Sequence, residues 1–103
     1  MNRLLPKLRL SRLRDIGWSL WDPIGILGEG EVWDGQPFAD EYDSYLRQVA
    51  GQLLLGHSES EMVDYLYDVA ANHMGLGPQP RLREAAERTV KAIATDDKLW
   101  NYD

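Results

Sequence analysis

Apolar side chains recur three and four positions apart from residue 40 onwards, which is the period of an α-helix with one buried face. The first such segment covers about residues 40–55 and precedes Gly56, which can end a helix because glycine adopts the left-handed conformation without steric cost. Its stripe consists of Tyr42, Tyr45, Leu46, Val49 and Leu53. We predict a helix with Asp40 as N-cap and with Glu41 and Asp43 in its first turn, where the helix dipole favours acids.

Two further segments have the same period. Ser58 and Glu61 have the spacing of a capping box, in which each side chain bonds a backbone N–H at a helix start, so we predict a helix from there to Gly75. Its stripe is Met62, Leu66, Val69, Ala70 and His73, and we expect this histidine to be buried. The prolines of "GLGPQP" then interrupt the chain. A third stripe, Leu82, Ala86, Thr89, Val90 and Ile93, predicts a helix over 81–95, and the short connections favour antiparallel packing.

The beginning of the chain allows two interpretations. One helical face can hold Leu5, Leu8, Leu10, Leu13 and Ile16 if Pro6 lies in the first turn of the helix. The alternation of Leu8 and Leu10 also permits a short strand. We predict a fourth helix here and keep the strand as the alternative.

Residues 17–39 contain several glycines and two prolines without a lasting period, which predicts a long loop. Structureless loops of this length are uncommon in compact domains. Apolar residues along the segment can hold it against the helices: Trp18, Trp21, Ile24, Ile26, Leu27, Val32, Trp33 and Phe38. With 103 residues and 44% apolar composition, the chain can bury one core. The prediction is an all-α single domain over residues 1–103, a bundle of about four helices with a long aromatic, glycine-rich loop between the first and second.

The stretch "WDPIG" within this loop matches a tight turn. Asp22, Pro23, Ile24 and Gly25 suit the four positions of a type I turn, in which the carboxylate of the first residue accepts the N–H two residues on. The alternative is a single helical turn with Asp22 as N-cap and Pro23 in first position. Trp21 would bury roughly 200 Å² and anchor the turn. Both interpretations make these residues structural.

Charge is unevenly distributed along the chain, which has a net charge of −6. Residues 15–80 contain twelve Asp or Glu and a single base, Arg47, and such a field repels phosphates and steers a basic protein inward. The first fourteen residues contain five bases and no acid: Arg3, Lys7, Arg9, Arg12 and Arg14. They could form a small nucleic-acid face, but the remaining charge opposes it, and we expect a protein partner instead. Alternatively, the acids only keep helical surfaces solvated.

One acidic pair stands out on the predicted second helix of this region. Asp64 and Asp68 lie one turn apart and are flanked by Tyr65 and Tyr67. Like charges at this spacing repel slightly, whereas carboxylates beside tyrosine rings suit the binding of Lys or Arg side chains. The alternative is a solvated helix face.

The candidates for chemistry are few. The chain has no cysteine and two histidines, and it lacks the phosphate-loop, dinucleotide and nucleophile-elbow patterns. His57 with Glu61 can form a surface pair or a fortuitous metal clip, and the acids of 29–34 do not have the ligand spacing of a calcium loop. We expect no metal, no cofactor and no catalysis. A small enzyme that uses His73 with a neighbouring carboxylate is an alternative.

The motifs "WDPIG" at 21–25 and "DEYD" at 40–43 together resemble a family of small helical bacterial proteins of unknown function. The resemblance implies a helical bundle and, for some members, a role as immunity partners of secreted or contact-delivered toxins.

The resemblance and the acidic field together predict an immunity or antitoxin-like inhibitor that covers a basic surface of a toxin or nuclease. The partner-binding residues we expect are Asp40, Glu41, Asp43, Asp64, Tyr65, Tyr67 and Asp68. The alternative is a self-associating accessory protein with exposed Trp33 and Trp100 as its contact patch. No apolar stretch approaches the ~20 residues of a membrane span, so we expect a cytoplasmic protein without a membrane partner, either a monomer or a weak homodimer.

Overall fold

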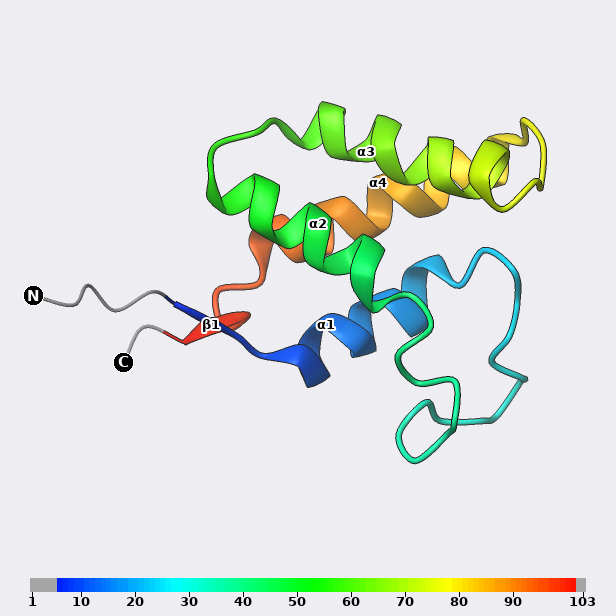
Figure 1. The fold of residues 1–103 in the computed structure, drawn as a ribbon, viewed down its shortest axis with the longest axis horizontal. Helices are drawn as coiled ribbons and strands as arrows, with labels where there is room; N and C mark the ends of the chain where they lie inside the picture. The colour runs from blue at the N-terminus through cyan, green and yellow to red at the C-terminus, as the bar shows by residue number, and fades with distance from the viewer. Residues whose placement is uncertain (1–5, 102–103) are drawn as a thin grey trace, which may run out of the picture.

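Four helices pack around one core in the structure, a computed structural model that describes residues 6–101 (Figure 1). The elements are β1 (Lys7–Leu8), α1 (Leu10–Ile16) with its π-helical continuation η1 (Gly17–Trp21), α2 (Asp43–Leu54), α3 (Glu59–Asp68) with its π-helical continuation η2 (Val69–His73), α4 (Pro80–Thr95) and β2 (Trp100–Asn101). The predicted all-α bundle is confirmed. Among the described helices, none has the length and apolar character that crossing a membrane requires.

The local signals predicted for the end of α2 and for the start of α3 are confirmed. Gly56 has a φ of 103°, and its N–H and that of His57 bond carbonyls of the last turn of α2, which closes the helix. The capping box is formed in both directions, because Glu61 N donates to Ser58 Oγ and Ser58 N donates to Glu61 Oε1, each at 3.1 Å. Helix α4 begins one residue before the predicted start.

The N-terminal segment begins as a short strand, which was the alternative interpretation, and continues as the predicted helix. Residues Lys7–Leu8 form a strand that pairs antiparallel with β2, with Leu8 opposite Trp100. Arg9 N then donates to Leu99 O at 2.8 Å, and α1 begins only at Leu10. A helix start near residue 5 is therefore wrong within the described residues, and Leu5 lies outside them. The cause is a partner strand at the other end of the chain.

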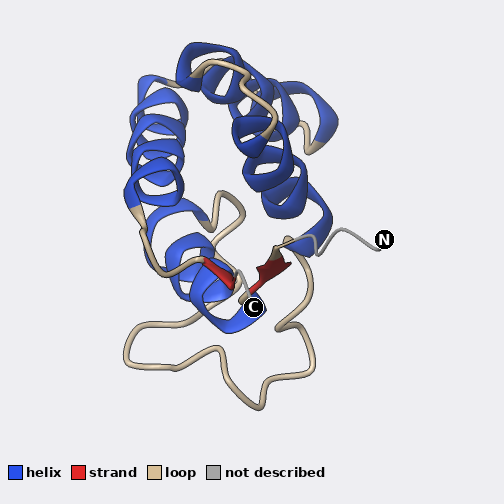
Figure 2. Cartoon of the chain, turned by 90° about the vertical axis from the view of Figure 1, so that its left-hand side faces the viewer, coloured by secondary structure: helices blue, strands red, loops and turns tan. Residues whose placement is uncertain are grey.

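Both predicted ends of the long loop are wrong. The first helix continues through η1 to Trp21, and the next helix begins at Asp43, so the irregular segment is 22–42 (Figure 2). Gly17 is helical, and it passes so close to α2 that a Cβ here would overlap Leu46. Residues 37–42 form successive turns, which leaves Asp40 outside the helix and not its N-cap; Glu41 is likewise outside the first turn, which contains only Asp43.

The core joins the predicted stripes of α2, α3 and α4 to the two tryptophans of η1. Its members include Leu13, Trp18, Trp21, Tyr42, Leu46, Leu66, Val90 and Leu99. Trp21 is 4% exposed, which confirms it as an anchor, and its Nε1 is buried without a hydrogen-bond partner among the described residues. The buried position predicted for His73 is wrong: it is exposed, because the wider π turn of η2 shifts the helical phase, and Met74 packs against the core instead.

Candidate functional site

Asp22 fastens the start of the loop to its end. Its carboxylate accepts Ile26 N at 2.9 Å, Leu27 N at 3.0 Å and the hydroxyl of Tyr42 at 2.8 Å. The predicted turn is confirmed by the 3.1 Å bond from Gly25 N to Asp22 O, but the carboxylate bonds the N–H groups four and five residues on, not two, and Asp22 follows a helix end instead of capping a start. Burial, and then the bond to Asp22, raise the pKa of Tyr42, which therefore keeps its proton.

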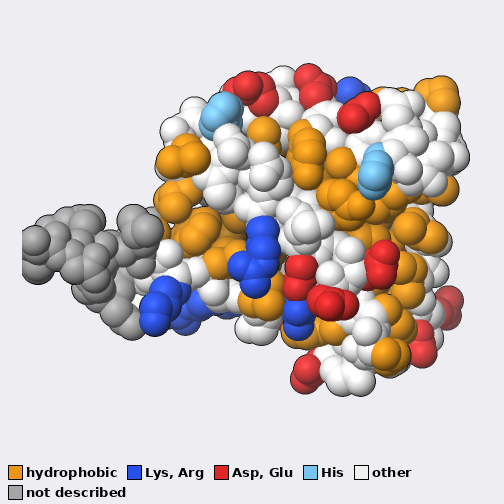
Figure 3. All heavy atoms as spheres, in the orientation of Figure 1, with side chains coloured by type: hydrophobic (Ala, Val, Ile, Leu, Met, Phe, Trp, Pro, Cys, Tyr) orange, Lys and Arg blue, Asp and Glu red, His pale blue; other side chains and the backbone are white. Residues whose placement is uncertain are grey.

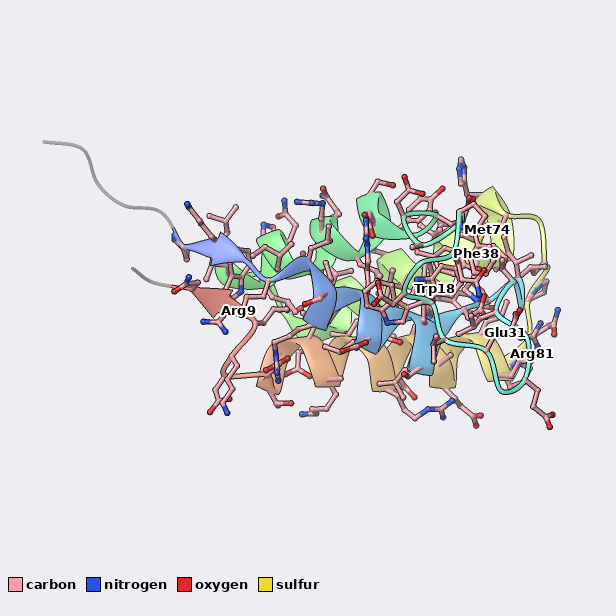
Figure 4. All side chains as sticks on the ribbon, turned by 90° about the horizontal axis from the view of Figure 1, so that it is seen from below. Arg9, Trp18, Glu31, Phe38, Met74 and Arg81 are labelled. Carbon is pink, nitrogen blue, oxygen red and sulfur yellow. The ribbon has the colours of Figure 1, made fainter. Side chains whose placement is uncertain are left out.

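Two further contacts fix the end of the loop. Trp18 Nε1 donates to Ala39 O at 3.1 Å, and its ring meets Phe38 edge to face at 5.4 Å (Figure 4). Arg14 of α1 forms a bidentate pair with Asp43 at 2.6 and 3.0 Å, with both side chains mostly buried. Both ends of the loop are thus held, the start through Asp22 and the end through Trp18 and Arg14, although the loop has little secondary structure of its own.

A groove of about 670 Å³ lies between α1–η1 and this loop. Its lining combines aromatic, aliphatic and acidic side chains: Ser11, Asp15, Trp18, Ser19, Leu27, Glu31, Val32, Trp33 and Asp34. Trp33 Nε1 donates to Asp15 Oδ1 at 2.6 Å, and Gly28 N donates to Glu31 Oε1 at 2.6 Å. The Arg14 guanidinium carbon lies 5.7 Å from the centroid of the Trp33 ring. We call this feature the loop groove.

The charge around the loop groove is one-sided. Residues 15–46 contain eight Asp or Glu and no Lys or Arg. In residues 6–101, Asp43 is the one of these eight with a cation within ion-pair distance. In Figure 3, acidic side chains gather over the loop at the lower right, and basic ones lie at the lower left towards the N-terminal segment. Six carboxylates therefore lie on or beside the loop with no Lys or Arg of the described chain within ion-pair distance: Asp15, Glu29, Glu31, Asp34, Asp40 and Glu41. Asp15 and Asp40 are nevertheless near enough to help raise the pKa values of Arg12 and Arg14, respectively.

The acid and tyrosine pattern on α3 does hold an arginine, but it is one from this chain. Arg83 of α4 lies 3.2 Å from the Asp64 carboxylate, and its guanidinium carbon is 4.7 Å from the centroid of the Tyr67 ring. Asn72 donates to Asp68 at 2.6 Å. Tyr65 packs against the core, and burial raises its pKa. The predicted binding residues are thus divided between the loop end and a face of α3 that is linked to α4.

The remaining predicted residues lie apart from the loop groove. His57 and Glu61 form the expected surface pair at 3.6 Å, and the backbone N–H of Ser58 is the main cause of the lowered pKa of Glu61. His73 meets the Tyr45 ring at 6.0 Å. Among residues 6–101, no group of three or more His, Asp or Glu is placed to hold a metal ion.

Two of the apolar side chains expected to hold the loop do not do so: Ile24 and Val32 are 50% and 68% exposed. Trp33 packs partly against the core, as expected of a residue that holds the loop, whereas the self-association alternative requires it and Trp100 to be exposed, and both are half-buried. A self-association patch on these two rings would therefore be smaller than expected.

Sequence reasoning missed Asp15 and Trp33 as partners, and Arg14 as the link between α1 and α2. Asp15 stands 18 residues from Trp33, and Arg14 stands 29 residues from Asp43. Neither separation is a helical or strand period. The available signal was the run of acids without bases, which marks the region but no individual contact.

Comparison of the chain with protein-family models, with curated proteins and with solved structures finds no match. The resemblance in "WDPIG" and "DEYD" stays a prediction, and the interpretation of the site depends on its geometry and charge.

Proposed function

We propose that this chain is a non-enzymatic, acidic protein-binding module, specifically an immunity or antitoxin-like inhibitor that covers a basic surface of a toxin domain or nuclease in a bacterial cytoplasm. The observation that supports it is the set of carboxylates around the loop groove, none of which has a Lys or Arg of the described chain within ion-pair distance. Unpaired surface charges of one sign accelerate the encounter with an oppositely charged partner.

In this proposal, fewer of the predicted residues are free to contact a partner than the sequence suggested. Asp43 and Asp64 already bind Arg14 and Arg83, so removing either acid would disturb the fold before it disturbed recognition. Asp40 and Glu41 are exposed at the loop end and keep their predicted role. In this proposal they act together with the loop groove, while Asp68, Tyr65 and Tyr67 contribute a secondary surface.

The test begins with the partner captured from the native host by the full chain. Its association rate is then measured against ionic strength for the wild type, for the double variant Asp40→Asn/Glu41→Gln, and for the matched control Glu84→Gln/Glu87→Gln on exposed positions of α4. We expect the loop variant to associate severalfold more slowly at low salt and the control to keep the wild-type rate. If both double variants slow association equally, the effect comes from net charge and the loop acids have no special role. An association rate that does not depend on salt would refute the electrostatic proposal.

A further inference from the structure

We propose that the loop groove is a receptor for an arginine side chain carried by a basic segment of the partner. This inference rests on the proposed function and names the chemical group that the acidic loop recognises. The groove is large enough for several side chains, and it combines indole rings with carboxylates in one continuous lining.

The carboxylates of the groove are prepared for a donor from outside. Asp15 has one oxygen held by the indole N–H of Trp33, and Glu31 has one oxygen held by Gly28 N, each at 2.6 Å. The second oxygen of each carboxylate has no bond to the described chain. Asp34 makes no hydrogen bond or ion pair within residues 6–101. An incoming cation therefore meets carboxylate oxygens that no Lys or Arg of the described chain holds at ion-pair distance.

The aromatic lining favours a guanidinium over an ammonium. Trp33 already accepts the Arg14 guanidinium near its ring at 5.7 Å, and Tyr67 accepts that of Arg83 at 4.7 Å. Planar guanidinium groups stack on aromatic rings and bond carboxylates through two donors at once, whereas an ammonium is a compact, strongly hydrated charge. The chain thus shows twice, on its own arginines, the combination of ring and carboxylate that the groove offers to a partner.

The shape of the groove is fixed before binding. Asp22, Trp18 and Arg14 tie the two ends of the loop to each other and to the helices through five side-chain hydrogen bonds besides the Tyr42 hydroxyl bond. A preformed groove loses less conformational entropy on binding than a flexible loop would.

The experiment follows the indole N–H resonances of the ¹⁵N-labelled full chain during titration with the peptide Ac-Gly-Arg-Gly-Arg-Gly-NH₂. The Trp33 resonance, assigned by its loss in Trp33→Phe, is expected to shift saturably with a Kd of about 1 mM, while that of buried Trp21 stays in place. The citrulline peptide, which has the same shape without charge, is expected to bind at least about tenfold more weakly, and the lysine peptide about threefold more weakly.

Variants then locate the binding. The double variant Glu31→Gln/Asp34→Asn is expected to raise the Kd of the arginine peptide about fivefold. The matched control Glu84→Gln/Glu87→Gln is expected to leave this Kd unchanged. The absence of a saturable Trp33 shift, equal binding of the citrulline or lysine peptide, or equal weakening by both variants would overturn the inference. A Trp33 shift that follows protein concentration without peptide would also overturn it, because the occupant would then be a second copy.

The two proposals fail separately. If the arginine peptide does not bind but Asp40→Asn/Glu41→Gln still slows the captured partner, the acidic binding function stands and the arginine receptor falls. If the peptide binds and the captured partner is indifferent to both salt and the loop variant, the groove is a guanidinium site and the inhibitor function falls.

Discussion

Replacing Asp22 by asparagine is expected to lower the free energy of unfolding by about 2 kcal/mol. The aspartate accepts three hydrogen bonds, from Ile26 N, Leu27 N and the Tyr42 hydroxyl, at 2.8 to 3.0 Å. An asparagine keeps one acceptor oxygen and turns an N–H₂ group towards a donor, so at least one bond is lost and the others lose their charged acceptor. A bond to a charged group contributes roughly 1.5–3 kcal/mol, and the half-buried position of Asp22 favours the lower end.

Urea denaturation followed by far-UV circular dichroism measures this change. The matched control is Asp34→Asn, an exposed position in the same loop without a bond in the described chain, and it is expected to stay within about 0.5 kcal/mol of the wild type. A loss of about 2 kcal/mol corresponds to a Tm roughly 8–16 °C lower for a domain of this size. If Asp22→Asn is no less stable than Asp34→Asn, the carboxylate does not hold the loop.

A double-mutant cycle with Tyr42→Phe separates the individual bond from the rest of the clasp. The phenylalanine keeps the buried ring and removes only the hydroxyl. The other arm of the cycle is Asp22→Ala, because an asparagine could still accept the hydroxyl through its remaining oxygen, so each single variant breaks the 2.8 Å contact. We expect a coupling energy of about 1 kcal/mol between the two sites. Additive losses would show that the hydroxyl and the carboxylate stabilise the loop independently.

Two other changes test the packing and the charge pairs. Gly17→Ala is expected to lower the free energy of unfolding by about 1 kcal/mol, because the added Cβ would overlap the buried Leu46. Gly51→Ala, in open space on α2, is expected to raise it by up to about 1 kcal/mol through helix propensity. A rise at both sites in urea denaturation would contradict the close approach of η1 and α2. The bidentate bond from Arg12 lowers the folded-state pKa of Asp96, so its contribution to stability is complete above the unfolded value of about 4 and is lost as the pH falls through the lowered pKa. Asp96→Asn is expected to flatten the acid side of the curve of Tm against pH, and an unchanged acid slope would contradict the pair.

The parts of the fold that could be predicted depend on near neighbours in sequence. The start of α3 follows from Ser58 and Glu61, which are three residues apart, and α4 follows from a stripe in which every predicted position is buried. Apart from His73, where the π turn of η2 shifts the helical phase, several errors arise where a distant residue contacts the segment. Leu8 is a strand residue because it pairs with Trp100, and Gly17 lies where η1 packs closely against Leu46 of α2. No local period carries this information.

The candidate site, like the fold, could be predicted only in part. The acidic character of residues 15–46 is plain in the sequence, and this region contains the three acids that line the loop groove. The sequence does not reveal which acids are already neutralised, because Arg14 reaches Asp43 and Arg83 reaches Asp64 only after the helices pack. These two acids looked equivalent to Asp40 until their partners were known.

The bond between Asp22 and Tyr42 connects "WDPIG" to "DEYD", because it joins a residue of the first motif to a residue of the second. The two motifs therefore supply the two halves of one clasp, in which Asp22 and Tyr42 are held by the fold, whereas Asp40 and Glu41 of the second motif stay exposed. Between the motifs, the side chains of Val32 and Asp34 take no part in the clasp; both are exposed and line the loop groove. A clasp that fixes both ends of a loop allows exposed positions such as these two to change at little cost in stability, whereas Trp33 and Phe38, which pack against the core, do not share this freedom. If the proposed function holds, the clasp residues form the scaffold, and recognition falls to the exposed acids of the loop and its end.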